Sequence, residues 1–222
     1  MVNNILDVSL MPNELILYSF RRCPYAIRAR MALAEAHISY TLREVDLKHK
    51  PEAMLIQSPK GTVPVLCGAY PEVIDESLAI VTWAGEQTET PIANDLNCSP
   101  WMVRLQATYI PLFNAIKHDF AQHSDKPHVQ AALADIAAFL EDLETLCATN
   151  QAPFSCKWLN IAVFPSIRQL WILAAFAPFR ARFIHITRWV ETVIDSTMFK
   201  QLMNKQAPWD PILDNAVFID NG

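Results

Sequence analysis

The chain has 222 residues, which is enough for one large domain or two modest ones. Apolar residues make up 52% of it and charged residues 18%, and there are only four glycines, so extensive disorder is excluded. The net charge of −5 gives no electrostatic reason to expect binding to nucleic acid or to an anionic membrane surface.

The N-terminal segment, MVNNILDVSLMPNELILYSF, lacks the basic start and the continuous apolar stretch of a secretory signal. We therefore expect a cytoplasmic protein. The most apolar segment, residues 159–179, approaches membrane-spanning length. Because Pro165 and Arg168 lie inside it and Pro178 ends it, a buried core helix is favoured over a transmembrane one.

Residues 14–87 alternate strand-like and helix-like patterns. The run ELILYSF is rich in residues typical of strands, and the following PYAIRARMALAEAH has apolar residues at helical spacing. The same reasoning predicts the order β-α-β-α-β-β-α for the whole segment. The strands are expected at 14–20, 39–47, 62–68 and 72–76, and the helices at 24–37, 51–57 and 77–87.

A stretch of polar and turn residues follows, and everything after it has helical patterns. The clearest helix is HVQAALADIAAFLEDLETLC, in which one apolar stripe contains Val129, Leu133, Ile136, Leu140, Leu143 and Cys147. Further helices are expected at 101–122, at 160–176, at 179–195 and after residue 196. The predicted organisation is an α/β domain over 1–85, a linker over 86–100 and an all-α domain over 101–222.

No metal site is expected. The cysteines are odd in number and lack the Cys-x-x-Cys spacing of a zinc site or a dithiol; they are Cys23, Cys67, Cys98, Cys147 and Cys156. His118, His123 and His128 are five residues apart, which spreads them around a helix instead of aligning them.

Cys23 stands at a predicted strand-to-helix turn, close to Arg21, Arg22 and Arg28. Unpaired N–H groups and the positive end of the helix dipole favour a thiolate at such a position. We therefore expect a lowered pKa and a reactive thiol. From these residues alone, a cysteine that merely packs in the core remains an open alternative.

Two further segments of the first domain combine with Cys23. Val63-Pro64 precedes a strand, and a cis bond there would leave the backbone of Val63 free to pair with an extended peptide; an ordinary edge-strand proline is the alternative. Glu76 and Ser77 begin a helix and either cap it or hold a ligand that carries an ammonium and a carboxylate. Lys50 would offer a cation to a second carboxylate.

The motifs LYSFRRCPYAIRARMAL, REVDLKHKPEAML, SPKGTVPVL and VIDESLAI, in this order, resemble the thioredoxin-like domain of the glutathione S-transferases. The resemblance is to the cysteine-type branch, which includes the omega class and many bacterial relatives. NIAVFPSIRQ and FKQLMNKQAPW resemble the family's helical domain. The resemblance therefore implies a thioredoxin-like α/β domain followed by a helical bundle, and a homodimer.

The resemblance also implies roles for individual residues. Cys23 is the expected catalytic cysteine, and Ala26 stands where a glutaredoxin-like dithiol would have its second cysteine, which leaves a monothiol route resolved by glutathione. No cofactor other than glutathione as cosubstrate is implied. The expected glutathione-binding residues are Lys50, Val63, Pro64, Glu76 and Ser77.

The predicted activity is thiol transfer to and from glutathione, with conjugation of glutathione to electrophiles as a competing activity. An acceptor would lie between the domains, where Tyr25, Trp101 and Tyr109 are candidates. Other transferase classes activate glutathione with a hydroxyl, for which Tyr18 and Ser19 are the alternatives to Cys23. A different class of function is that of a non-enzymatic interaction protein, as in the stringent-starvation-type relatives of this fold.

Overall fold

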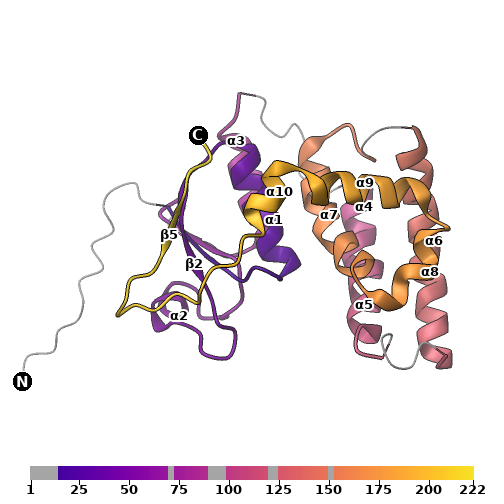
Figure 1. The fold of residues 1–222 in the computed structure, drawn as a ribbon, viewed down its shortest axis with the longest axis horizontal. Helices are drawn as coiled ribbons and strands as arrows, with labels where there is room; N and C mark the ends of the chain where they lie inside the picture. Colours follow the sequence, from indigo (N-terminus) through magenta and orange to yellow (C-terminus); the bar gives the residue numbers. More distant parts are fainter. Residues whose placement is uncertain (1–14, 70–72, 90–98, 120–124, 150–152) are drawn as a thin grey trace, which may run out of the picture.

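The computed structural model describes residues 15–69, 73–89, 99–119, 125–149 and 153–222. An α/β domain and a helical domain lie side by side, and the C-terminal tail returns from the helices to the α/β domain (Figure 1). The first domain has the predicted order of elements. They are β1 (Ile16–Ser19), α1 (Pro24–Glu35), β2 (Tyr40–Glu44), α2 (Glu52–Gln57), β3 (Val65–Cys67), β4 (Val73–Ile74) and α3 (Ser77–Glu86).

The strands form one mixed sheet in the order β4-β3-β1-β2-β5. The central strand β1 runs parallel to β2 and antiparallel to β3. Its residues are all buried, because alternate side chains enter two different clusters: Leu17 packs with residues of α1 and α3, whereas Ile16 and Tyr18 pack with Met54 and other residues on the opposite face. The thioredoxin-like prediction is confirmed, and both faces of the sheet are covered.

The prediction of an all-helical segment through residue 222 is wrong for the end of the chain. Residues Val217–Ile219 form a fifth strand, β5, which pairs antiparallel with β2, so that Leu42 lies opposite Val217. In Figure 1 the yellow tail crosses back to the first domain and lies along β2. The tail covers what would otherwise be an exposed sheet edge, a pairing that only the folded chain brings about.

The second domain consists of helices, as expected. The elements are α4 (Pro100–Arg104), the π-helical turn η2 (Leu105–Tyr109), α5 (Ile110–Ile116), α6 (Pro127–Thr149), α7 (Lys157–Trp171), the 3₁₀ turn η3 (Ala174–Phe176), α8 (Ala177–Arg180), α9 (Ile184–Asp195) and α10 (Thr197–Leu202). Every residue of the stripe predicted in α6 is buried. Most of the predicted linker, residues 90–98, lies outside the described residues.

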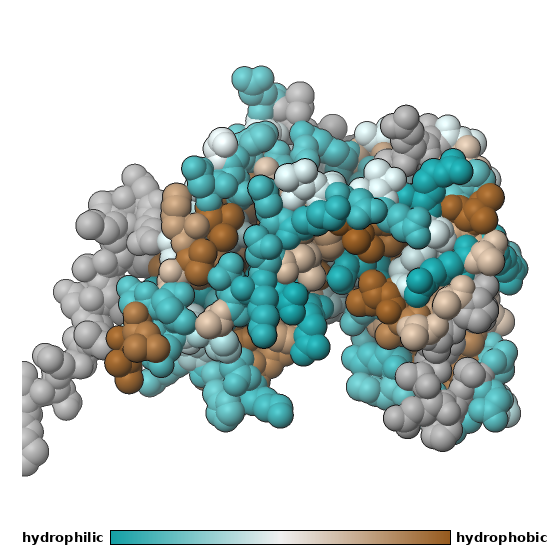
Figure 2. Space-filling model, viewed as in Figure 1, coloured by the Kyte–Doolittle hydropathy of each residue, from teal (hydrophilic) through white to brown (hydrophobic). Residues whose placement is uncertain are grey.

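The apolar segment that approaches membrane-spanning length divides into α7, η3 and α8. Pro165 lies inside α7, which is largely buried, and the helix ends at Trp171. Within the described part of the chain, no helix has the length and apolar character needed to cross a bilayer. Figure 2 shows polar residues over much of the visible face, with smaller apolar areas between them.

Two buried arginines of α1 connect the first domain to the helices. Arg30 forms a 2.6 Å ion pair with Glu44 of β2, accompanied by hydrogen bonds to Ser19 and to the carbonyl of Leu202 in α10. Arg28 donates from Nε to the carbonyl oxygen of Ala162 in α7 at 2.8 Å. Helix α1 is therefore fixed against both domains, and this fixes the start of the helix, where Cys23 lies.

Candidate functional site

Cys23 occupies the N-cap of α1, with an extended backbone (φ −73°, ψ 123°) and Pro24 as the first helical residue. Proline suits that position because it needs no hydrogen-bonded N–H there. The thiol is partly exposed, and its Sγ lies 3.8 Å from the carbonyl oxygen of Val63. It opens onto a cavity of about 370 Å³ between the domains, which we call the Cys23 cleft.

Burial raises the pKa of the Cys23 thiol above its ordinary value, although the backbone N–H groups of Ala26 and Tyr25 and the charge of Arg28 act in the opposite direction. The expected lowering of this pKa is therefore wrong in its net direction. The helix N–H groups and Arg28 act as the sequence indicated, whereas Arg21 and Arg22 are not among the causes, and the loss of solvent around the sulfur outweighs the groups that do act.

The Val63–Pro64 peptide bond is cis. Val63 is buried and ends a loop that precedes β3, and its N–H makes no hydrogen bond to any described residue. An unpaired N–H beside a strand can bind an added extended peptide. The cis geometry and the free N–H agree with the expectation that Val63 presents its backbone to a ligand next to Cys23.

Lys50 lies next to Gly61, two residues before Val63. The Lys50 Nζ is so close to Gly61 that a Cβ added at this glycine would lie 3.6 Å from it. Gly61 has a left-handed φ of 62°, a conformation that favours glycine. Lys50 is exposed, and none of the described carboxylates forms an ion pair with it. Its charge is therefore available to an anionic group bound along the Val63 loop.

Glu76 and Ser77 begin α3. Glu76 is its N-cap residue but makes no side-chain capping hydrogen bond; instead its carboxylate accepts a 2.6 Å hydrogen bond from Lys60 and stays largely exposed. Ser77 is buried, and its Oγ accepts a 2.9 Å hydrogen bond from Nη1 of Arg28. The pair therefore presents a carboxylate to solvent and a hydroxyl oriented by a buried cation.

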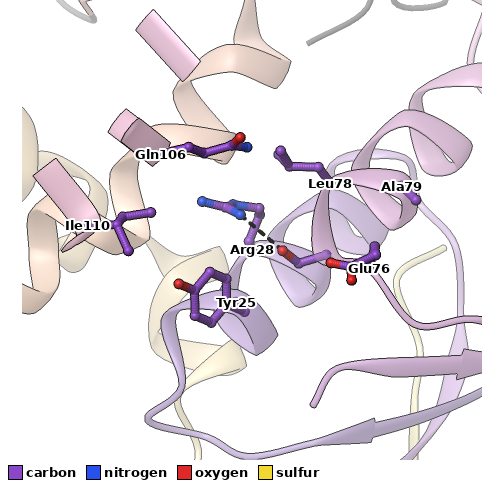
Figure 3. Close-up of a pocket in the computed structure, with 8 residues that line it drawn as sticks. Tyr25, Arg28, Glu76, Leu78, Ala79, Gln106 and Ile110 are labelled. Atoms are coloured by element: carbon purple, nitrogen blue, oxygen red, sulfur yellow. Dashed lines mark hydrogen bonds between the residues drawn. The ribbon is translucent and has the colours of Figure 1, made fainter. Parts of the chain in front are cut away.

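Arg28 itself was not among the residues predicted to bind a ligand. It lines a cavity of about 610 Å³, the Arg28 cavity, between α3 and the η2–α5 segment, where it lies among Tyr25, Gln106 and Leu78 (Figure 3). The side chain is 2% exposed, and its Nη2 has no hydrogen-bond partner among the described residues. Burial lowers the pKa of Arg28 to about 10. A buried guanidinium without a carboxylate is a suitable partner for an anionic ligand group.

The three predicted acceptor-site residues lie in different surroundings. Tyr25 is 37% exposed and lines both cavities, so it separates one from the other. Tyr109 forms part of the wall of the Cys23 cleft, but it is 1% exposed and donates its hydroxyl hydrogen to the carbonyl oxygen of Ser166. Trp101 packs edge-on against Phe139 and Phe154 and lines neither cavity, so the structure does not bring it to Cys23.

The comparison with family models decides the family. Residues 17–91, which contain Cys23, the Val63 loop and the start of α3, match the N-terminal domain of glutathione S-transferases. Residues 17–91 of this chain therefore belong to the glutathione S-transferase family as its N-terminal domain. The assignment made from the motifs is confirmed.

Curated relatives resemble the same part of this chain. The chain is 40% identical over 74 residues to pyrimidodiazepine synthase of Drosophila melanogaster and 33% identical over 73 residues to glutathione S-transferase omega-1 of Mus musculus. These matches cover 32% and 33% of the chain, and 30% of the length of each relative. They carry information on the α/β domain and not on the helical one.

The structural similarity of this chain extends further than the sequence similarity. A glutathione transferase family member from Pseudomonas fluorescens has a TM-score of 0.73 to this chain, with 16% identity over 88% of this chain and 95% of that one. At this identity the likeness shows the fold alone. The helical domain of this chain is therefore arranged as in glutathione S-transferases, although its sequence differs widely.

The hydroxyl alternatives of other transferase classes have structural roles in this member. Tyr18 is buried, and its hydroxyl oxygen accepts a 2.6 Å hydrogen bond from Arg43. Ser19 is buried as well, and its Oγ accepts a 2.9 Å hydrogen bond from Arg30. Neither lines the Cys23 cleft or the Arg28 cavity. This agrees with the interpretation that they serve packing and hydrogen bonding.

Sequence reasoning missed two residues that line the Arg28 cavity. Arg28 was noted only as a nearby charge, since its partner Ala162 is 134 positions away along the chain. Gln106 lies in a π-helical turn, a feature frequent at functional sites, which the predicted regular helix over 101–122 did not include. In the described parts of the chain, no three His, Cys, Asp or Glu side chains are grouped so as to hold a metal ion.

Proposed function

We propose that this glutathione S-transferase is a glutathione-dependent thiol transferase in which Cys23 is the nucleophile. The observation that carries the proposal is the position of Sγ, 3.8 Å from the Val63 carbonyl and next to an unpaired Val63 N–H, at the mouth of the Cys23 cleft. A peptide thiol paired with Val63 would have its sulfur beside Cys23. The omega-class relatives and the Pseudomonas fluorescens structure, which holds two glutathione molecules, support glutathione as that peptide.

The remaining charges suit the two ends of glutathione. The exposed carboxylate of Glu76 would bind the ammonium of the γ-glutamyl end. The Ser77 hydroxyl, whose oxygen already accepts from Arg28, has its hydrogen free to donate to the carboxylate of that same end, and the unpartnered Nη2 of Arg28 adds a charge. Lys50 would meet the glycine carboxylate at the opposite end, along the Val63 loop.

Thiol transfer then proceeds in two exchanges. The Cys23 thiolate attacks the glutathione sulfur of a mixed disulfide, forming a Cys23–glutathione disulfide and releasing the acceptor as a thiolate, which takes up a proton. The thiolate of a second glutathione attacks the glutathione sulfur of that intermediate. Oxidised glutathione leaves, and Cys23 is regenerated as a thiolate.

Ala26 determines the route by which the intermediate is resolved. It is the position one helical turn after Cys23, and its side chain is buried and apolar. With no second thiol in the motif, an intramolecular disulfide cannot form there. The proposed cycle therefore consumes two glutathione equivalents for each reduced acceptor, one of them already carried by the mixed disulfide.

The pKa of Cys23 bears on the rate of the first exchange. Because burial raises that pKa, only a small fraction of the thiol is ionised at neutral pH, and the thiolate that does form is stabilised by the N–H groups of Tyr25 and Ala26 and by Arg28. A high-pKa thiolate is also the stronger nucleophile once formed. The proposed activity therefore increases as the pH is raised.

Conjugation of glutathione to an electrophile is the second candidate. The observation in its favour is the aromatic and aliphatic part of the Cys23 cleft, which includes Tyr25, Ile110 and Phe113 and would hold an apolar body. From the family resemblance we also propose that the protein forms a homodimer and lies in the cytoplasm. The arrangement of Cys23, Val63 and Lys50 favours a glutathione-binding enzyme over a non-enzymatic interaction protein.

The experiment compares the wild type with Cys23→Ser and with Cys156→Ser, an exposed cysteine outside the site. Reduction of the mixed disulfide of glutathione and 2-mercaptoethanol is followed beside conjugation of a chlorodinitrobenzene. We expect thiol transfer to be lost in Cys23→Ser alone, and mass spectrometry to find glutathione on Cys23. If neither activity nor glutathione binding is detected in the wild type, the enzyme proposal is overturned.

A further inference from the structure

The Cys23 cleft carries an uneven charge. Among the described residues that line it, the two charged side chains are the cations Arg22 and Lys117, and no carboxylate faces the cavity. This is unexpected for a chain whose net charge is −5. The two cations come from different domains: Arg22 lies immediately before Cys23, and Lys117 follows α5.

Neither cation is neutralised by a described carboxylate. The Arg22 guanidinium lies over the Phe20 ring at 5.5 Å. Among the described residues, Nζ of Lys117 donates only to the amide oxygen of Asn114, at 3.2 Å. Two neighbouring carboxylates have other partners. Glu44, which accepts a hydrogen bond from the backbone N–H of Arg21, pairs with Arg30, and Asp119, two residues after Lys117, pairs with Lys126 and His128. The positive charge at this cleft is therefore available to a ligand.

Two more cations are chain neighbours of residues that line the cleft. Arg168 precedes Gln169, which lines the cavity, and its buried Nε has no hydrogen-bond partner among the described residues. Burial and the positive charge of Arg21 lower the pKa of Arg168. Arg21 in turn neighbours Arg22. Low-dielectric walls that carry charge of one sign attract counter-charged substrates into a cleft.

We propose that the acceptor thiol released in the Cys23 cleft belongs to a carboxylate-bearing compound, whose carboxylate is held by Arg22 and Lys117. This inference rests on the proposed thiol-transfer function and names its acceptor class. The apolar wall at Tyr25 and Phe113 would cover the carbon chain of such an acceptor. In the first exchange the disulfide breaks and the acceptor sulfur leaves as a thiolate, so the same cations face two negative charges on the product.

The test uses three mixed disulfides of glutathione that differ in the terminal group of the acceptor: 3-mercaptopropionate as the anion, 3-mercaptopropionamide as its neutral isostere, and cysteamine as a cation. kcat/KM is measured for the wild type, for Arg22→Gln, for Lys117→Gln and for the double variant. Lys205→Gln, an exposed cation that lines neither the Cys23 cleft nor the Arg28 cavity, is the control. Thermal unfolding verifies that each variant is folded.

We expect the wild type to prefer the anion over its amide by about tenfold in kcat/KM, and the cation to be the poorest substrate. The preference should fall to about unity in the double variant, persist in Lys205→Gln and weaken with added salt. Equal kcat/KM for the anion and the amide, or a preference that survives in the double variant, overturns the inference alone. Absence of turnover with all three substrates overturns the proposed function, and the inference with it.

Discussion

Nη1 of Arg28 donates a 2.9 Å hydrogen bond to Oγ of Ser77. This bond joins α1, which follows Cys23, to the first residue of α3. The same guanidinium reaches Ala162 in the helical domain through Nε. One buried side chain therefore couples the thiol helix, the α3 N-terminus and the second domain.

Replacing Arg28 with lysine should weaken glutathione binding while keeping the charge. A lysine has one ammonium and cannot donate to Ala162, Ser77 and a ligand carboxylate in the fork geometry of guanidinium. A lost charge-assisted hydrogen bond corresponds to about tenfold in affinity or more. Calorimetric titration with glutathione measures it, and Arg188→Lys on the exposed face of α9 should bind as the wild type does. Unchanged affinity in Arg28→Lys would argue against Arg28 as a ligand group.

The reactivity of Cys23 should increase with pH beyond the range of an ordinary thiol. Burial raises the pKa of this group above its reference of 9.0, so the thiolate fraction at pH 7 is below that of a free cysteine and continues to rise above pH 9. Alkylation by iodoacetamide, followed by peptide mass spectrometry between pH 6 and 10, gives the profile. An alkylation rate that reaches its plateau below pH 8 would contradict this prediction and indicate that the pKa of Cys23 is lowered.

Glu44→Gln should destabilise the protein by about 3–5 kcal/mol, because it leaves the buried Arg30 guanidinium without its counter-charge. Glu44 also accepts a hydrogen bond from the backbone N–H of Arg21, so the loop before Cys23 should loosen as well. Urea unfolding measures the stability. The exposed Glu52→Gln serves as the matched control and should change the free energy of unfolding by less than about 0.5 kcal/mol.

Trp209→Ala should cost about 3 kcal/mol of stability. Trp209 lies in the C-terminal tail, is 9% exposed and packs edge-on against Tyr18 of the central strand, with the Arg43 guanidinium 4.1 Å from its ring centroid. Phe218→Ala, in the same tail but 67% exposed, should cost less than about 1 kcal/mol. Similar losses in the two variants would mean that the tail does not stabilise the sheet through Trp209.

The order of elements in the first domain could be predicted because its patterns are local. Leu17, for example, lies in a short apolar run, and the stripe through Leu133 and Leu140 in α6 repeats at helical spacing. The motif around Cys23 could be recognised for the same reason, since the cysteine, proline and arginines are neighbours along the chain. The fifth strand could not, because Val217–Ile219 is too short to signal a strand without its partner β2.

By itself, the sequence determined the family of the first domain, the thioredoxin-like order of elements and the candidate thiol, because each depends on residues close together in the chain. The tertiary structure alone decided the environment of that thiol. Burial outweighs the helix N–H groups and raises the Cys23 pKa, and packing of α7 against α1 leaves Arg28 buried with an unpartnered nitrogen. The tertiary structure also places Trp101 away from the Cys23 cleft and Lys117 in its lining. Solvent exclusion and contacts between distant segments arise only when the two domains are packed together.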